Sequence, residues 1–368
     1  MSVELNDRLK LRPSVAVTSN LGLTEFFLSN IRKTIALQMK EDVVNLLFEL
    51  DGEKTLTEWF GEKGFLAEEQ SDFIQLLAYL NSNCVLIKQD ELYNNDYEVY
   101  PRVFTLLEDF YSSQSEVNCA YDKIRTSFVM IIGLGSVGTW VAQSLLMSGV
   151  KNFIFVDADT VELSNLHRQC GFSEKQIGQK KVDAFSSRLK EMTGDVNIER
   201  VYDMLTHRFF KEHSFQKIDL IINCADYPTV DETSRIVGEF AMQNGIPHVI
   251  GGGYNLHQSL IGEVIMPGKT ACLECFRMNL DDLNEIDTSN IKKLENKNRK
   301  IGSFPPLSAL SASITTNESF KVLAGLSNLV MSNNRTEFRM QSLNFVNMEM
   351  KRRNDCKWCG YEGKYYHI

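Results

Sequence analysis

The sequence has no long hydrophobic run and no excess of positive charge. No stretch approaches the roughly 20 consecutive apolar residues that a membrane-spanning helix needs. The N-terminal residues include Glu4, Asp7, Arg8 and Lys10, where a signal peptide would have an apolar core. The formal net charge of −9 opposes nonspecific binding to nucleic acid or to an anionic membrane. We therefore expect a cytoplasmic, soluble protein whose partners are neither nucleic acids nor membranes. A length of 368 residues predicts about two domains.

A disulfide framework is also absent from the cysteine pattern. Half of the eight cysteines occur singly in apolar surroundings and are predicted to be small core residues: Cys84, Cys119, Cys170 and Cys224.

The remaining cysteines form two C-x-x-C pairs, one near the middle of the chain and one near its end. The pairs are Cys272 with Cys275 and Cys356 with Cys359. Each pair can chelate a metal from one tight turn, and two pairs complete the tetrahedral shell of Zn²⁺. The pattern therefore predicts a structural zinc site. An alternative is that one or both pairs are reduced buried thiols or a redox couple.

A glycine-rich turn follows the apolar run 127–132. Gly133, Gly135 and Gly138 form a G-x-G-x-x-G motif, which leads into a periodic segment at 139–147. A second apolar run then delivers Asp157, about 20 residues after the last glycine. This order predicts the nucleotide-binding half of a doubly wound Rossmann-like α/β sheet. The glycines and the helix N-terminus would take phosphate, and the acid would take ribose hydroxyls.

The residues after Asp157 distinguish among nucleotide chemistries. Asp159 is followed by the amides of Asn165 and Gln169, the guanidinium of Arg168 and the ammonium of Lys181. A dehydrogenase needs only one or two counter-charges for a pyrophosphate that stays intact. A site that breaks the α–β phosphate bond of ATP must neutralise a triphosphate, which favours Arg, Lys and Mg²⁺ acting together.

A further apolar run, 220–224, ends just before Asp226. A carboxylate at this place is the predicted Mg²⁺ ligand, because Mg²⁺ commonly uses one or two protein carboxylates and completes its shell with water and phosphate oxygens. An alternative role for Asp226 is that of a helix N-cap or turn residue ahead of Pro228.

The ordered set of motifs over about residues 100–368 resembles the ThiF, MoeB and ubiquitin-activating-enzyme superfamily of ATP-dependent carboxylate adenylators. The resemblance implies that Arg168, Lys181 and Asp226 are catalytic and that a carboxylate attacks the α-phosphate. It also implies a homodimer in which an arginine crosses to the other subunit, for which Arg102 is the candidate; a surface arginine in a linker is the alternative. The polar segment 276–304 is expected to form a mobile crossover loop or a plain solvated loop. Since this segment has no cysteine, a thioester relay is not expected.

Residues 1–98 form a separate predicted module. Strands at 14–17 and 33–38, helices at 43–50, 55–60 and 68–80, and a strand at 83–88 predict a small α+β winged helix. Its pattern resembles the PqqD-like recognition element for ribosomally made peptides. That resemblance implies capture of a leader peptide as an added strand. The helix at 68–80 has no Lys or Arg, which argues against DNA binding, and a merely structural cap is the alternative.

The two modules, 1–98 and 99–368, together resemble peptide adenylators of the microcin C and pantocin A type. The resemblance implies an enzyme of antibiotic biosynthesis that captures a precursor peptide and adenylates a glutamate side chain or a C-terminal carboxylate, using ATP, Mg²⁺ and structural Zn²⁺. Two alternatives stay open. One is an adenylyltransferase for the C-terminus of a sulfur-carrier or ubiquitin-like protein. The other is a non-catalytic partner that presents a leader peptide to another enzyme.

Overall fold

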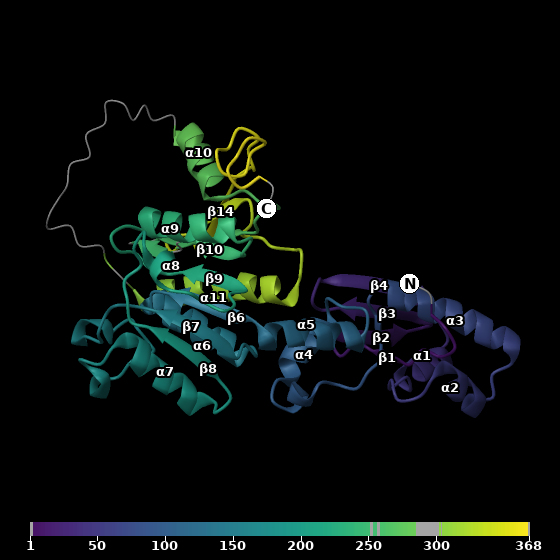
Figure 1. The fold of residues 1–368 in the computed structure, drawn as a ribbon. Coiled ribbons are helices and arrows are strands. Elements are labelled where there is room, and N and C mark those ends of the chain that lie inside the picture. The colour runs from purple at the N-terminus through teal and green to yellow at the C-terminus, as the bar shows by residue number, and fades with distance from the viewer. Residues whose placement is uncertain (1–2, 251–252, 256–257, 285–301, 303, 367–368) are drawn as a thin grey trace. The chain divides into compact units, whose positions relative to one another are not determined.

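The computed structural model describes residues 3–250, 253–255, 258–284, 302 and 304–366 (Figure 1). The chain divides into two compact units, residues 1–122 and 123–368, and each is described by itself. The division falls inside helix α5 (Gln114–Thr126). Residues 99–122 thus belong to the first compact unit, while the boundary of functional modules at 98/99 stays a prediction. Among the described helices, none is both long and apolar enough to cross a membrane.

The first unit contains a three-stranded antiparallel sheet in the order β2 (Val15–Asn20), β3 (Leu23–Leu28), β4 (Lys33–Gln38). A two-stranded ribbon pairs β1 (Leu9–Leu11) with β5 (Leu86–Lys88). Strands β1 and β3 were not predicted from the sequence. The signal for β3 was the tight turn before it, where Leu21 and Gly22 both have positive φ and join two strands as a hairpin.

The predicted helices of this unit are present, with shifted ends. They are α1 (Glu41–Phe48), α2 (Leu56–Lys63) and α3 (Ala67–Ser82). Helix α2 begins with a capping box in which Thr55 and Glu58 satisfy each other's backbone N–H groups. Trp59 stacks on Phe73 of α3 with ring centroids 5.4 Å apart. These rings join Phe26 and Leu28 of β3 in one apolar core, so helices and sheet form a single packed module.

Two short helical segments, η1 (Asn95–Glu98) and α4 (Pro101–Glu108), complete the first unit. Buried polar contacts attach α4 to the β1–β5 ribbon. Lys10 forms an ion pair of 3.0 Å with the buried Glu108, and Tyr93 donates a hydrogen bond of 2.6 Å to the same carboxylate. The guanidinium of Arg12 donates to the carbonyls of Leu86 and Glu108. Residues past 98 are therefore integral to this compact unit.

The second unit is built on a six-stranded sheet in the order β13-β10-β9-β6-β7-β8. The strands are β6 (Phe128–Ile132), β7 (Asn152–Val156), β8 (Asn197–Val201), β9 (Leu220–Asn223), β10 (His248–Ile250) and β13 (Glu263–Ile265). All neighbours are parallel except β10 and β13. The predicted doubly wound α/β sheet is confirmed.

Helices cover both faces of this sheet, which is why its central strands are apolar throughout (Figure 1). On one face, Met130 and Ile221 pack with Ile236 and Val237 of α9 (Val230–Gln243). On the other, Phe155 packs against Phe185 of α7 (Lys181–Met192), with centroids 5.5 Å apart. Helix α6 (Ser136–Met147) contacts α7 and α11 (Pro305–Ala324).

The remaining elements follow or interrupt this core. They are η2 (Leu163–Asn165), η3 (Glu174–Gln176), α8 (Phe209–Glu212), α10 (Leu273–Asn284) and a four-stranded antiparallel sheet of β11 (Gly253–Asn255), β12 (Gln258–Ile261), β14 (Asn334–Arg339) and β15 (Asn344–Glu349). The predicted crossover loop begins as helix: residues 276–284 belong to α10. Most of its remainder, 285–301 and 303, lies outside the described residues.

Candidate functional site

A cavity of about 690 Å³ lies at the carboxyl ends of β6, β7, β8 and β9. The carboxyl ends of parallel strands meet at one edge of the sheet, and this is where such folds bind ligands. Most of the predicted nucleotide-binding residues line the cavity: Gly133, Gly135, Asp157, Asp159, Asn165, Arg168, Gln169, Lys181 and Asp226. The sheet thus brings together residues that are widely spaced in the sequence.

The glycine turn owes its shape to close backbone contacts. Gly133 has φ +89°, and a Cβ there would lie 2.8 Å from the backbone nitrogen of Ala225, at the end of β9. A Cβ on Gly138 would lie 2.0 Å from the carbonyl oxygen of Gly133. Gly138 is thus a packing residue and does not line the cavity. A Cβ on Gly135, in contrast, would meet no atom within 4 Å. Gly135 is the N-cap of α6 and has no side-chain cap.

The Asp157 carboxylate holds the glycine turn in place. One oxygen accepts a hydrogen bond of 2.6 Å from the backbone N–H of Leu134, and the other accepts one of 2.8 Å from Asp159. Burial raises the pKa of the Asp157 carboxyl, while the nearby Lys181 ammonium acts in the opposite direction. Hydrogen bonds from the protein backbone therefore orient Asp157, the residue that is predicted to bind ribose.

Two cations face the cavity from the segment that follows β7. Lys181, the first residue of α7, is almost fully buried and forms an ion pair of 2.6 Å with Asp159. Arg168 donates a hydrogen bond of 2.6 Å to the carbonyl of Ser164, and its Nη1 also lies 2.9 Å from His167 Nε2. Only Nη1 of the guanidinium makes these contacts, so its other N–H groups are available to an anionic ligand.

The two predicted amides differ in how well they are satisfied. Asn165 Oδ1 accepts a hydrogen bond of 3.0 Å from the N–H of Glu162, which shapes the turn at η2. Gln169 is 5% exposed, and its Oε1 has no hydrogen-bond partner among the described residues. A buried amide oxygen without a partner costs free energy. Because Gln169 lines the cavity, a donor group of a ligand would satisfy it.

Asp226 follows β9 and is exposed at the cavity wall. Within the described residues its carboxylate makes no hydrogen bond or ion pair. The alternative role as helix N-cap is wrong, because the N-cap of α9 is Thr229, whose side chain accepts from the N–H of Glu232. A free carboxylate at this edge suits a hard cation such as Mg²⁺.

Arg102, a further predicted site residue, is not among the residues that line the cavity. It lies on α4 in the first unit and is exposed. Within the described parts of the chain it forms no ion pair.

Further residues that line the cavity at two strand ends were not predicted from the sequence. They are Asp203, Met204 and Leu205 after β8, and Tyr227 and Val230 after β9. The signal for the first group was Asp203, an acid just after a strand, but β8 is a partly exposed edge strand without an apolar run. His213 Nε2 lies 2.8 Å from Asp203 Oδ2, and this contact lowers the pKa of the Asp203 carboxyl.

The residues present fit an adenine nucleotide with a divalent cation. The N-terminus of α6 has no side-chain cap, Gly135 leaves open space above it, and Arg168 and Lys181 supply positive charge. The unpartnered Gln169 Oε1 needs a donor, which a nucleoside offers through its hydroxyl or amino groups. Asp226 would hold the cation.

A second candidate site is a cluster of the paired cysteines. Sγ of Cys272 lies 3.8 Å from that of Cys275 and 3.5 Å from that of Cys356, and Cys275 lies 3.3 Å from Cys359. A tetrahedral zinc ion with Zn–S bonds of ~2.3 Å requires S···S separations of ~3.8 Å. A disulfide would need ~2.05 Å. The cluster therefore fits the predicted zinc site.

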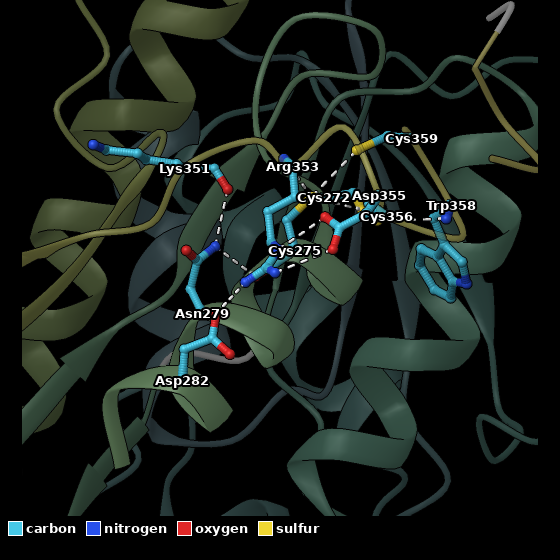
Figure 2. Close-up of polar contacts among 10 residues, drawn as sticks. All are labelled: Cys272, Cys275, Asn279, Asp282, Lys351, Arg353, Asp355, Cys356, Trp358 and Cys359. Atoms are coloured by element: carbon cyan, nitrogen blue, oxygen red, sulfur yellow. Dashed lines mark hydrogen bonds and ion pairs between the residues drawn. The ribbon is translucent and has the colours of Figure 1, made fainter. Parts of the chain in front are cut away.

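Several polar groups around this cluster contact the cysteines or one another (Figure 2). The N–H groups of Arg353 and Trp358 each donate to a cysteine sulfur at 3.4 Å. The carbonyl of Cys275 accepts a hydrogen bond of 2.7 Å from the Asn279 side chain, which also donates one to the carbonyl of Lys351. Figure 2 shows the Arg353 side chain between Asp355 and Asp282, with which it forms ion pairs. These contacts fix α10 to the C-terminal segment and orient the ligands.

The prediction for the single cysteines was wrong for half of them. Cys84 and Cys119 are exposed, and Cys170 and Cys224 are partly buried. Cys84 has φ +59° at the end of α3, a turn position that faces solvent. Cys224 lines the cavity, and burial raises the pKa of its thiol to about 12. The neighbouring apolar residues in the sequence did not indicate which way each side chain points.

The fold and the site define an α/β nucleotide-binding protein with a zinc-type cysteine module. The ThiF family model matches residues 110–359, and the chain belongs to the ThiF family. Among curated relatives, SUMO-activating enzyme subunit 2 of Dictyostelium discoideum is 30% identical over 159 residues, which is 42% of this chain and 23% of the relative. Adenylyltransferase and sulfurtransferase MOCS3 of Drosophila persimilis is 31% identical over 191 residues, 52% of this chain and 39% of the relative. The chain spans less than half the length of these relatives.

Solved structures match nearly the whole chain. E. coli MccB has a TM-score of 0.76 at 20% identity, covering 98% of this chain and 99% of MccB. MccB with AMPCPP and the peptide MccA gives 0.74 at 19% identity, covering 96% and 100%. PaaA gives 0.70 at 19% identity, covering 92% and 99%. The fold likeness thus includes the first unit, which the family model leaves largely unmatched.

Proposed function

We propose that this protein adenylates a carboxylate of a ribosomally made precursor peptide, with ATP as the second substrate. The observation that carries the proposal is the cavity in which Arg168, Lys181 and Asp226 meet around the glycine turn. The fold likeness to MccB bound to AMPCPP and MccA, over 96% of this chain, supports a peptide rather than a ubiquitin-fold carrier as the acyl substrate. The SUMO-activating enzyme subunit and the MOCS3 relative match only 42% and 52% of this chain.

The proposed reaction forms one bond and breaks another at the α-phosphorus. A carboxylate oxygen of the peptide attacks, and the bond between the α-phosphorus and the bridging oxygen breaks, so that pyrophosphate leaves with the electron pair. The products are an acyl-adenylate and pyrophosphate. Arg168 and Lys181 neutralise the charge that accumulates on the leaving group. Mg²⁺, when held by Asp226, supplies further neutralisation and orients the phosphate oxygens.

The first unit is proposed to bind the leader of the peptide as a winged-helix recognition module. Its small sheet has two outer strands, β2 and β4, whose outward backbone groups are not paired with another described strand. An extended peptide can add to such an edge, with main-chain hydrogen bonds for affinity and side-chain pockets for choice. Helix α3 carries acidic residues in its first turn and no Lys or Arg. Its charge therefore disfavours nucleic acid as the ligand.

For Arg102 we propose a homodimer, in which this residue reaches the cavity of the second copy. Apolar side chains around α4 support it: Val99 is 68% exposed, Leu106 47% and Phe110 44%. Leu106 lies one helical turn after Arg102 on α4, while Val99 and Phe110 lie just before and just after this helix. Exposed apolar side chains grouped in this way are typical of a protein interface.

The test is an incubation of the purified protein with Mg·ATP and each of two acyl donors. One is any short peptide that a reading frame next to the gene encodes, and the other is a ubiquitin-fold carrier ending in Gly-Gly. Pyrophosphate release and an adenylated mass with the peptide alone are expected. Adenylation of the carrier alone would instead make the protein a sulfur-carrier activator. If the protein neither binds ATP nor releases pyrophosphate, the non-catalytic, leader-presenting alternative remains.

A further inference from the structure

The cavity has apolar side chains at two separate ends. Met204, 42% exposed, and Leu205 follow β8, whereas Tyr227, 66% exposed, and Val230, 37% exposed, follow β9. In the sheet order β9-β6-β7-β8, two strands lie between these ends. Three strand spacings correspond to about 14 Å. One flat ring system cannot cover both ends at once.

The polar groups of the cavity lie between the two apolar ends. The glycine turn follows β6, and Asp157 follows β7. If phosphates lie at the glycine turn and a ribose at Asp157, the base continues in the same direction, toward Met204 and Leu205. A nucleotide has only one base. The end formed by Tyr227 and Val230 is therefore left without the base or the ribose to cover it.

Tyr227 and Val230 lie directly beyond the predicted metal ligand Asp226. Val230 is the first residue of α9 and lies one turn before Thr233, at the end of the side that α9 buries, where it lines the cavity wall and is 37% exposed. Within the described parts of the chain, the Tyr227 ring has no aromatic partner and its hydroxyl no hydrogen bond. An exposed aromatic ring at a cavity wall offers a large contact area at a small entropic cost.

The charges near this end are negative. Asp226 precedes Tyr227, and the first turn of α9 carries Asp231 and Glu232. When no cation is bound to Asp226, an acyl chain with a second carboxylate would be repelled here. An apolar chain would gain contact with Tyr227 and Val230 and would not meet this repulsion.

We propose that Tyr227 and Val230 form an acyl subsite, which takes the apolar carbon chain attached to the activated carboxylate. This inference rests on the proposed adenylation. It adds the chemistry of the acyl substrate: an apolar chain is preferred, and a chain that bears another carboxylate is rejected. Tyr227 is a specificity residue in this scheme, and the phosphate chemistry does not depend on it.

The experiment uses non-hydrolysable analogues of an acyl-adenylate, so it does not need the natural peptide. Full-length protein is titrated calorimetrically with AMP and with 5′-O-sulfamoyladenosine acylated by acetyl, 4-methylpentanoyl or succinyl groups. The 4-methylpentanoyl analogue is expected to bind about tenfold more tightly than the acetyl analogue, which corresponds to burial of a few methylene groups. The succinyl analogue is expected to bind more weakly than the acetyl analogue.

Variants assign the preference to the named side chains. Tyr227→Ala is expected to bring the affinities of the acetyl and 4-methylpentanoyl analogues within about twofold of each other, with AMP binding unchanged. Tyr227→Phe should keep the preference, and Val230→Thr should reduce it in part. The matched control is Tyr361→Ala, because Tyr361 is 65% exposed and does not line the cavity. This control should bind every analogue as the unaltered protein does.

Three results would overturn the acyl subsite. The unaltered protein could bind the acetyl and 4-methylpentanoyl analogues equally, or Tyr227→Ala could retain the preference. Tyr227→Ala could also weaken AMP as much as the acylated analogues, which would assign the ring to the nucleotide. In each case intact AMP and ATP binding by the unaltered protein leaves the proposed adenylation standing. Failure to bind ATP and every adenosine analogue would remove both proposals.

Discussion

The nucleotide cavity and the cysteine cluster occupy the same compact unit and treat polar atoms in opposite ways. In the cavity, Asp226 is exposed and unpaired within the described residues, and Gln169 Oε1 is buried without a partner. Around the cysteines, backbone N–H groups point at the sulfurs, and the carbonyls of Cys275 and Cys359 accept from Asn279 and Arg352. In the cavity, polar side chains are left available to a ligand, while around the cysteines the backbone N–H groups and carbonyls named above are hydrogen-bonded; the buried Tyr365 hydroxyl is an exception.

This difference indicates that polar groups serve binding in the cavity and structure around the cysteines. A reacting site needs groups that are oriented by the protein and still available to substrate. A structural metal site needs ligands whose surroundings are complete before the metal adds its bonds. Changes at the cluster should therefore alter stability first, and changes at the cavity wall should alter binding first. The following predictions test that division, beginning with the largest effect.

Loss of one cysteine ligand should have the largest effect on stability. Cys356→Ser removes a thiolate from a cluster whose sulfurs are almost fully buried. We expect the zinc content, measured by inductively coupled plasma mass spectrometry, to fall from one ion per chain to near zero. Stability should drop by on the order of 4–5 kcal/mol, because a structural metal contributes directly to folding. Thermal unfolding measures the drop. Cys119→Ser changes an exposed cysteine and should alter neither quantity. An unchanged melting temperature in Cys356→Ser would contradict a structural zinc site.

Two glycines of the same motif should separate packing from binding. In Gly138→Ala the new methyl group would lie 2.0 Å from the Gly133 carbonyl oxygen, so the turn must shift. We expect a loss of about 2–3 kcal/mol in urea unfolding, together with weaker ATP binding. In Gly135→Ala the methyl group meets no protein atom within 4 Å and enters the cavity. This variant should unfold like the unaltered protein and still bind ATP about tenfold more weakly. Equal unfolding curves for the two variants would show that the close contact at Gly138 relaxes without cost.

The site could be predicted from the sequence where chemistry depends on residue type and order. The places of Gly133, Asp157 and Asp226 at one edge of the sheet were predictable because each follows a strand end, while their roles stay predictions. The cysteine cluster was identifiable because C-x-x-C spacing limits what the thiols can bind.

Other features could not be predicted, because they depend on the direction of side chains or on turns between short strands. Tyr227 and Val230 line the cavity only because the chain turns at Thr229 into α9. Strand β3 follows a hairpin turn with Leu21 at positive φ, an unusual residue for that conformation. The exposed Cys84 and Cys119 are preceded or followed by apolar residues and differ from core cysteines only in the face they occupy.

Arg168 should affect binding with little effect on folding. The guanidinium is anchored through Nη1 alone, and its remaining N–H groups are proposed to bind the outer phosphates. In Arg168→Ala we expect ATP affinity to fall by about 10- to 100-fold, which is typical for loss of a charge-assisted hydrogen bond. AMP affinity should stay within about twofold, because AMP lacks the outer phosphates. Calorimetric titration measures both. Arg208→Ala is the matched control, since Arg208 is exposed and does not line the cavity. Equal losses for AMP and ATP would place Arg168 at the nucleoside instead.

The smallest expected effect is a loss of stability in acid that depends on His248, which lies near the cysteine cluster. His248 is fully buried on β10 opposite Ile265, which packs in the same apolar cluster as the cysteines. Burial lowers the pKa of His248 to about 4, below its ordinary value. As the pH falls below about 6.5, the unfolded chain takes up a proton that the folded chain refuses, so stability decreases until the pH reaches the folded pKa.

At pH 5 this uptake should cost about 2 kcal/mol relative to pH 7.5. We expect His248→Gln to lose less stability over that range than the unaltered protein, as measured by chemical unfolding at each pH. Protonation of the cysteines also weakens zinc binding in acid, but it acts on both proteins and cancels in the difference. His207→Gln, which changes an exposed histidine, should follow the unaltered protein. If His248→Gln and the unaltered protein lose stability in parallel, the acid sensitivity of this unit lies in the cysteine ligands, and the contrast between cavity and cluster becomes sharper still.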